Sequence, residues 1–411
     1  MKKVVVAGTS VYGIENQGDE AMLNVFCREL RASLPGVEIT LLARHPGKEL
    51  DELHGVKSIQ NLEHESKAKS MGRWFNGLNA GDSSQRLRQI RQALEDSDLL
   101  VIGGDPFAEI TLGFYRGLAP YAALLITLAK FLEKPVMLYG IHMGRPLTTE
   151  LGKELTRFCL SNASLVTLRE EFSRQVIVEM GIDDSNTAVL ADTAFGLNPV
   201  SDKTGQKILD KEGISFKSDK VIGVNFRHEY WRWKEADWQR YSSILAEVCD
   251  WMVKEFGADI LFIPNCTYDT DHQYEDDRPT ARDIVAKMKH RKNAHQIRGR
   301  YNLFETLSLF PLLDMHFSNR RHSLIFAAVH GVPPVGCGGE WHVKPALDDL
   351  GVGDAFTKIE ELAADTLKEK LGYIWGKRQE VSDNIRKSLP VLREKACRHG
   401  RLAAALAGGI K

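Results

Sequence analysis

Short apolar runs recur along the first half of the chain, at residues 4–7, 37–43, 99–102, 135–139, 165–168 and 188–190. Helix-like stretches separate them, and the first of these, residues 20–33, turns Ala21, Val25 and Leu30 toward one face. Buried parallel strands have continuous apolar sequences, and strands that alternate with helices are typical of a doubly wound sheet. The pattern therefore predicts a parallel α/β domain over residues 1–200.

A second series of apolar runs begins at residues 221–226 and continues at 260–264, 295–298, 315–318 and 333–336, with a helical stretch at 236–256. We interpret the polar, strand-poor residues 201–220 as a linker. Because 411 residues exceed what one core usually supports, we expect two Rossmann-like domains in tandem, the second over residues 221–375. A last helix within residues 376–411, kinked at Pro390, is expected to pack back across the junction. Ligands bind beyond the carboxyl ends of parallel strands, so we expect the site in a cleft between the domains.

Composition and charge exclude several classes of protein. The 54 Lys and Arg residues nearly cancel the 55 Asp and Glu residues, so no overall field favours nucleic acid or an anionic membrane. No apolar run has the roughly 18 residues of a membrane span, and residues 4–7 are too short for a signal-peptide core, so we expect a cytoplasmic location. The six cysteines include no C-x-x-C pair and the thirteen histidines no H-x-x-x-H spacing, so we expect no metal or cofactor.

The first turn holds the motif N-x-G-D-E, formed by Asn16, Gly18, Asp19 and Glu20. It matches neither the dinucleotide nor the P-loop fingerprint. Asp19 has the chemistry of an N-cap and Gly18 lets the chain turn. Amide groups at a helix start also suit an anion or a sugar hydroxyl, so we keep both interpretations.

Two further strand ends carry polar residues. Gly103, Gly104 and Asp105 follow the run at 99–102, where paired glycines permit either a tight turn or the close approach of a ligand. His142 and Arg145 follow the run at 135–139, again at a carboxyl edge. Two polar insertions, residues 67–84 and 265–280, have the length of lids, although surface excursions explain them as well.

In the second half, Arg227 follows the run at 221–226, and a guanidinium there can bind a carboxylate or phosphate in bidentate fashion. Tyr230, Trp231 and Trp233 come next; they either stack on sugar faces or pack against the following helix. The densest cluster is Arg320–Arg321–His322, where the run at 315–318 leads into an apolar helix. Two arginines favour an anion, and a histidine can move protons near neutral pH.

In this order and spacing, these segments resemble the polysaccharide pyruvyl transferase family over nearly the whole chain. The segments are Asn16-Gln17-Gly18-Asp19-Glu20-Ala21, Gly103-Gly104, Arg227, Arg320 to Ala327, and Lys344 with Leu350-Gly351. The resemblance implies a GT-B-like fold, phosphoenolpyruvate as donor and co-substrate, and a ketal-linked pyruvate on a sugar as product.

The resemblance also implies residue roles. The donor-site arginine and the catalytic histidine correspond to Arg227 and His322, with Arg320 in support. From their own positions in the sequence, we also expect Arg321, Lys344 and His142 to be substrate-binding residues. The chain departs from the family at Asp105, where many members have glycine, and at Asn265, where members often carry a histidine-containing acceptor loop. Both departures concern the acceptor.

Two other functions stay open at this point. A GT-B glycosyltransferase would bind the diphosphate of a nucleotide sugar with the same arginines and transfer a whole sugar. A non-catalytic carbohydrate-binding protein would bind sugar without turnover. The sequence leaves open the acceptor sugar, its linkage to lipid, the ketal stereochemistry and the oligomeric state.

Overall fold

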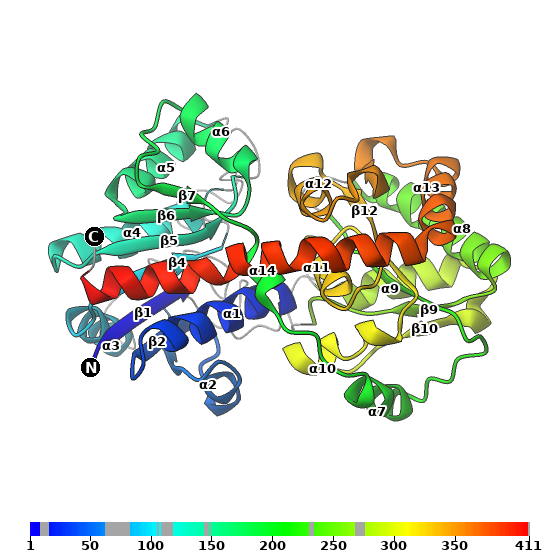
Figure 1. Cartoon of the computed structure of the whole chain (residues 1–411), viewed down its shortest axis with the longest axis horizontal. Helices are drawn as coiled ribbons and strands as arrows, with labels where there is room; N and C mark the ends of the chain where they lie inside the picture. The colour runs from blue at the N-terminus through cyan, green and yellow to red at the C-terminus, as the bar shows by residue number, and fades with distance from the viewer. Residues whose placement is uncertain are drawn as a thin grey trace. The chain divides into compact units, whose positions relative to one another are not determined.

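The computed structural model describes residues 1–8, 16–61, 83–104, 107, 118–143, 147, 149–229, 234–267 and 276–409 (Figure 1). The chain divides into two compact units. Unit 1 contains Met1–Ile14, Asp19–Gly196 and Arg393–Lys411, and unit 2 contains Glu15–Gly18 and Leu197–Leu392. Each unit has its own parallel sheet, which confirms the expected pair of Rossmann-like α/β domains.

The sheet of unit 1 has seven strands in the order β3-β2-β1-β4-β5-β6-β7, all parallel. The strands are β1 Lys3–Gly8, β2 Glu38–Ala43, β3 Lys57–Gln60, β4 Leu99–Gly103, β5 Val136–Ile141, β6 Leu165–Leu168 and β7 Thr187–Val189. The helices are α1 Gln17–Ser33, α2 Lys48–His54, α3 Ser83–Glu95, α4 Leu118–Phe131, α5 Glu150–Asn162 and α6 Glu171–Glu179, followed by the 3-10 turn Thr193–Gly196.

The central strands of this sheet are buried on both faces, which explains their continuous apolar sequences. Val5 and Ile102 belong to one apolar cluster with Leu125 and Ile126 of α4. Phe26 of α1 stacks on Tyr139 of β5, with the ring centroids 4.3 Å apart. Helix α1 is thereby held against the strand whose carboxyl end carries His142.

The sheet of unit 2 has six parallel strands in the order β10-β9-β8-β11-β12-β13. The strands are β8 Val221–Asn225, β9 Asp259–Phe262, β10 Ala294–Gln296, β11 Met315–Ser318, β12 Pro334–Gly338 and β13 Phe356–Lys358. The helices are α7 Lys203–Glu212, α8 Glu235–Phe256, α9 Asp277–Lys287, α10 Leu303–Leu307, α11 Arg321–Val329, α12 Glu340–Asp349 and α13 Ala364–Gly376, with 3-10 turns at Arg291–Asn293, Phe310–Leu312, Gly353–Ala355 and Ile359–Glu361.

Residues 201–220, interpreted from the sequence as a linker, contain helix α7. Gly213 ends this helix in the left-handed conformation, with φ of 68°. A β-carbon on Gly205 would lie 2.2 Å from the carbonyl oxygen of Ser308, so α7 packs closely against the backbone after α10. The polar sequence of the segment therefore reflects a surface helix of unit 2.

The last helix, α14, runs from Arg378 to Gly408, is drawn red in Figure 1 and contains Pro390. Its residues up to Leu392 belong to unit 2 and those from Arg393 to unit 1. Within unit 1, the Nε2–H of His399 donates to the carbonyl of Ala191 (2.9 Å), and its Nδ1 lies 2.7 Å from the hydroxyl of Thr167. Among the described residues, no helix is long and apolar enough to span a membrane.

Candidate active site

Arg227 lies just beyond the carboxyl end of β8 and is held there through its backbone. Its N–H donates to Oδ1 of Asn319 (2.8 Å), and Nδ2 of Asn319 donates to its carbonyl (3.0 Å). Asn319 follows β11, which pairs with β8 in register. One carboxamide thus fixes the backbone that carries the Arg227 guanidinium.

The segment after β11 brings three cationic or ionisable side chains to the same sheet edge. Arg320 precedes α11, is 8% exposed, and its N–H donates to the hydroxyl of Ser318 (2.9 Å). Arg321 is 1% exposed, and His322 is half-buried in the first helical turn. Positive groups at the positive end of a helix are unfavourable by themselves and favour a bound anion.

The two arginines are close enough to repel one another. Burial lowers the pKa of Arg227, and the positive charge of Arg320 lowers it further, whereas Glu229 and Asp277 act in the opposite direction. An anion between the guanidinium groups would relieve this repulsion. The electrostatics of the cluster therefore match a carboxylate or phosphate ligand.

The start of α1 belongs to unit 2 and meets this cluster. Asn16 forms an isolated antiparallel bridge with Cys266, and the N–H of Gln17 donates to the carbonyl of Asn265 (3.0 Å). A β-carbon on Gly18 would lie 2.1 Å from Nδ1 of His322. Three predicted site residues, Asn16, Gly18 and Asn265, are thus brought to the His322 region.

The predicted N-cap of this helix needs a correction. The helix begins at Gln17, so Asp19 lies in its first turn, and the N–H of Gly18 donates to Oδ1 of Asn16 (3.3 Å). Asn16 therefore supplies the capping oxygen. The charge of Asp19 still favours the positive end of the helix.

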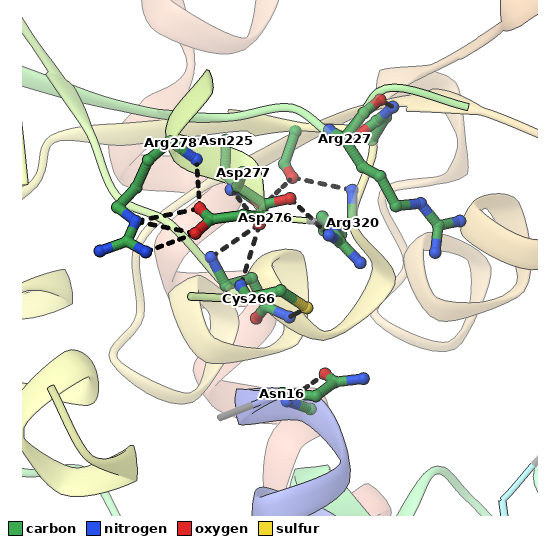
Figure 2. Close-up of polar contacts among 12 residues, drawn as sticks. Asn16, Asn225, Arg227, Cys266, Asp276, Asp277, Arg278 and Arg320 are labelled. Carbon is green, nitrogen blue, oxygen red and sulfur yellow. Dashed lines mark hydrogen bonds and ion pairs between the residues drawn. The ribbon is translucent and has the colours of Figure 1, made fainter. Parts of the chain in front are cut away.

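Asp277, an acidic residue that the sequence did not indicate, contacts both the strand ends and Arg320. Asp277 accepts hydrogen bonds from Asn225 and from the backbone of residues 265 and 266, and it forms an ion pair with Arg320 (Figure 2). Asn225 could have been noticed as the polar end of an apolar strand. Asp277 has no such signal, because it stands among several carboxylates in residues 265–280.

The other predicted residues of unit 1 have close structural neighbours. The carboxylate of Glu20 lies 2.5 Å from Nε2 of His54, and both side chains are buried. A β-carbon on Gly103 would lie 2.0 Å from the ring of Tyr139, so tight packing requires glycine there. Gly104 has φ of 96°, a conformation that glycine adopts readily.

His142 has an oriented partner at the carboxyl ends of β5 and β6. Its Nδ1 lies 2.8 Å from Glu170, and Ser173 also donates to that carboxylate. A carboxylate only accepts hydrogen bonds, so the neutral ring carries its lone pair on Nε2. The His142 side chain is 3% exposed.

Of the remaining predicted site residues, Lys344 is described and the others lie outside the described ranges. Lys344 lies on α12 and pairs with Asp348 one turn later (2.6 Å). Asp105, Arg145, Tyr230, Trp231, Trp233 and residues 67–82 and 268–275 lie outside the described residues. Within the described ranges, no three His, Cys, Asp or Glu side chains gather as a metal site would require.

Comparison with known proteins identifies the sequence family. The profile of the polysaccharide pyruvyl transferase family matches residues 16–340. The amylovoran biosynthesis protein AmsJ of Erwinia amylovora is 21% identical over 408 residues, which cover 94% of this chain and 95% of AmsJ.

Solved structures share the fold at low sequence identity. The Anabaena protein HepE in complex with UDP-glucose has a TM-score of 0.62 and 12% identity, with 98% of both chains covered. A putative UDP-N-acetylglucosamine 2-epimerase from Listeria monocytogenes has a TM-score of 0.60 and 12% identity, covering 100% of this chain and 96% of the other. These likenesses concern the fold, which is GT-B-like.

Proposed function

This chain belongs to the polysaccharide pyruvyl transferase family, and we propose that it transfers the enolpyruvyl group of phosphoenolpyruvate to sugar hydroxyls. The product is a ketal-linked pyruvate on a polysaccharide, its precursor or a glycolipid. The observation that carries the proposal is the grouping of Arg227, Arg320 and His322 at the carboxyl ends of β8 and β11. The naming of AmsJ for amylovoran biosynthesis supports a polysaccharide acceptor.

The donor's two anionic groups suit the two guanidinium groups. Phosphoenolpyruvate carries a carboxylate and a phosphate, and each can accept paired hydrogen bonds from an arginine. The positive charge of Arg320 lowers the pKa of Arg227, so the two guanidinium groups repel one another. Binding of the donor would therefore replace a repulsion with two charge-assisted contacts.

His322 is the group proposed to move protons. One sugar hydroxyl adds to C2 of the donor and loses its proton, while C3 gains a proton. The C2–O bond to phosphate then breaks, inorganic phosphate leaves, and a second hydroxyl attacks the oxocarbenium-like C2 and loses its proton. An imidazole can both accept and donate a proton near neutral pH, so this side chain can take up and return these protons.

The test incubates the protein with phosphoenolpyruvate and a panel of free, polymeric and lipid-linked sugars while inorganic phosphate is measured. We expect phosphate release that requires both donor and acceptor and survives excess chelator. Parallel reactions contain UDP-glucose or UDP-N-acetylglucosamine as donor. Turnover with a nucleotide sugar alone would identify a glycosyltransferase instead, and sugar binding without any turnover would identify a carbohydrate-binding protein.

A further inference from the structure

Asp277 stands at the first position of α9 and is 2% exposed, yet its carboxylate has contacts on both oxygens (Figure 2). Its Oδ2 accepts from Nδ2 of Asn225 (3.1 Å) and from the N–H groups of Asn265 (2.9 Å) and Cys266 (3.0 Å). Its Oδ1 forms a buried ion pair with a terminal nitrogen of Arg320. The carboxylate is therefore held by protein groups on both of its oxygens.

These contacts come from separate parts of the sheet edge. Asn225 ends β8, residues 265 and 266 follow β9, and Arg320 precedes α11. Cys266 in turn bridges Asn16, and the carbonyl of Asn265 accepts from Gln17. Asp277 thus ties the Arg320 guanidinium to the same backbone that holds residues 16 and 17.

The neighbouring carboxylate, Asp276, has a different set of partners. It caps α9 by accepting from the N–H of Arg278 (2.8 Å), and both of its oxygens lie 3.0 Å from Nε of Arg278. No described contact joins it to Arg320. Asp276 and Asp277 are adjacent and carry the same charge, but of the two, Asp277 is the one that contacts Arg320.

We infer that Asp277 is a positioning residue for the donor: it holds the Arg320 guanidinium beside Arg227 so that both face one anion. The inference rests on the proposed function, because the anion is taken to be phosphoenolpyruvate. Asp277 contacts Arg320 and acts through it. Its three other hydrogen bonds keep the carboxylate from turning, so the position of Arg320 is set by the sheet edge.

Removing the charge of Asp277 has two effects of opposite sign on anion binding. As a simple counter-charge, Asp277 weakens the attraction for an anion, so its loss would tighten donor binding. As a positioning residue, it keeps Arg320 in place, so its loss would weaken donor binding. The direction of the change distinguishes the two roles.

The experiment measures phosphoenolpyruvate affinity by calorimetry for the wild type, Asp277→Asn and the matched control Asp276→Asn. Both variants remove one negative charge at neighbouring positions, and asparagine still caps α9 in the control. We expect the dissociation constant to rise about 10-fold or more for Asp277→Asn, because one partner of a buried charged pair is lost. For Asp276→Asn we expect it to be unchanged or slightly lower.

A double-variant cycle tests whether Asp277 acts through Arg320. In an Arg320→Gln background, Asp277→Asn should have no further effect on donor affinity. Asp277→Glu keeps the charge but lengthens the side chain, so it should also weaken donor binding. This variant replaces Asp277→Asn in the affinity measurement if the asparagine variant does not fold. Unchanged or tighter donor binding in both Asp277 variants overturns the inference.

A crystal structure of Asp277→Asn examines the position of Arg320 without any donor. We expect the guanidinium to leave its wild-type place; finding it unmoved overturns the inference. This readout is separate from the proposed function. A wild-type protein that fails to bind phosphoenolpyruvate would count against the function, while the crystal structure still decides the role of Asp277.

Discussion

Arg227 and His322 can be separated by conservative replacement. Arg227→Lys keeps the charge but removes the planar pair of donors, so the dissociation constant for phosphoenolpyruvate should rise about 10-fold. His322→Asn keeps hydrogen bonding but cannot exchange a proton near neutral pH, so turnover should fall about 10²-fold while donor affinity is largely kept. Calorimetry and phosphate release, measured on both variants, check the two expectations.

Each variant has a result that contradicts its assigned role. Near-normal turnover in His322→Asn would remove the imidazole from the proton transfers. Unchanged donor affinity in Arg227→Lys would move the anion site toward Arg320 and Arg321. Both proteins should keep the wild-type melting temperature. That result would show that the changes in donor affinity and turnover arise at the site and are not caused by unfolding.

Gly18 is expected to matter through the space it leaves for His322. In Gly18→Ala the new methyl group would overlap the imidazole, because its carbon would lie 2.1 Å from Nδ1 of His322. Alanine favours a helix more than glycine does, so backbone stability should not fall for local reasons. Because a displacement of about 1 Å at a catalytic group can reduce turnover about 10²-fold, kcat should fall much more than donor affinity.

The matched control for this variant is Gly376→Ala, a helical glycine with no heavy atom within 4 Å of the added methyl position. It should leave kcat unchanged. Equal kcat values for Gly18→Ala and the wild type would show that the histidine ring can move aside at no catalytic cost.

At this scale the sequence indicated the position of the proposed reacting groups better than that of their supports. Arg227 and His322 follow apolar runs that end at a predicted sheet edge, and the structure has both residues at that edge. Position 18 needs a glycine because the ring of His322 lies against it. His322 is distant in sequence and becomes a neighbour of Gly18 only in the fold. Asp277 differs from Asp276 only by the direction of its side chain, which no local pattern records.

At the scale of elements, apolar runs predicted every central strand, whereas the edge strands β3 and β13 were missed. β3 reads Lys-Ser-Ile-Gln, and β13 is three residues long. An edge strand pairs on one side and needs little apolar sequence, so its pattern resembles a loop. Helix α7 was missed because an exposed helix among polar residues has few inward positions.

Gly400 of α14 offers a test of helix packing. Alanine in the middle of a helix usually stabilises it by about 1 kcal/mol relative to glycine. Here the added methyl group would lie 2.7 Å from the carbonyl oxygen of Phe26 and 2.8 Å from the N–H nitrogen of Leu30 in α1. We expect Gly400→Ala to lower the free energy of unfolding by about 1 to 3 kcal/mol, as measured in urea.

Gly408→Ala is the control in the same helix, because no heavy atom lies within 4 Å of its added methyl position. It should leave stability equal or slightly higher. A stabilised Gly400→Ala protein would mean that α1 and α14 pack less tightly than these distances require.

For the whole molecule, buried neutral histidines link stability to pH. Burial lowers the pKa of His399 from 6.5 to about 4, and it lowers the pKa of His316 to about 3. The unfolded chain takes up protons below about pH 6.5 while these native side chains do not. The free energy of unfolding should therefore decrease progressively as the pH falls from about 6.5 toward 4.

Urea unfolding of His399→Gln at about pH 7.5 and about pH 5 isolates one of these contributions. Glutamine can still donate to the carbonyl of Ala191 but does not titrate. The loss of stability between the two pH values should be smaller than in the wild type by on the order of 1 to 2 kcal/mol. The exposed His290→Gln variant should behave like the wild type, and an equal loss in His399→Gln would contradict the assigned protonation.

The division of α14 between the units has a consequence for the order in which the protein is made. A ribosome delivers residues 1–196 first, yet unit 1 also needs residues from 393 onward, including His399 and Gly400. Unit 2 needs only residues 15–18 and 197–392. The unit that is translated second is therefore the first to have all of its parts, and we expect it to fold first, in contrast to the usual N-terminal-first order during synthesis.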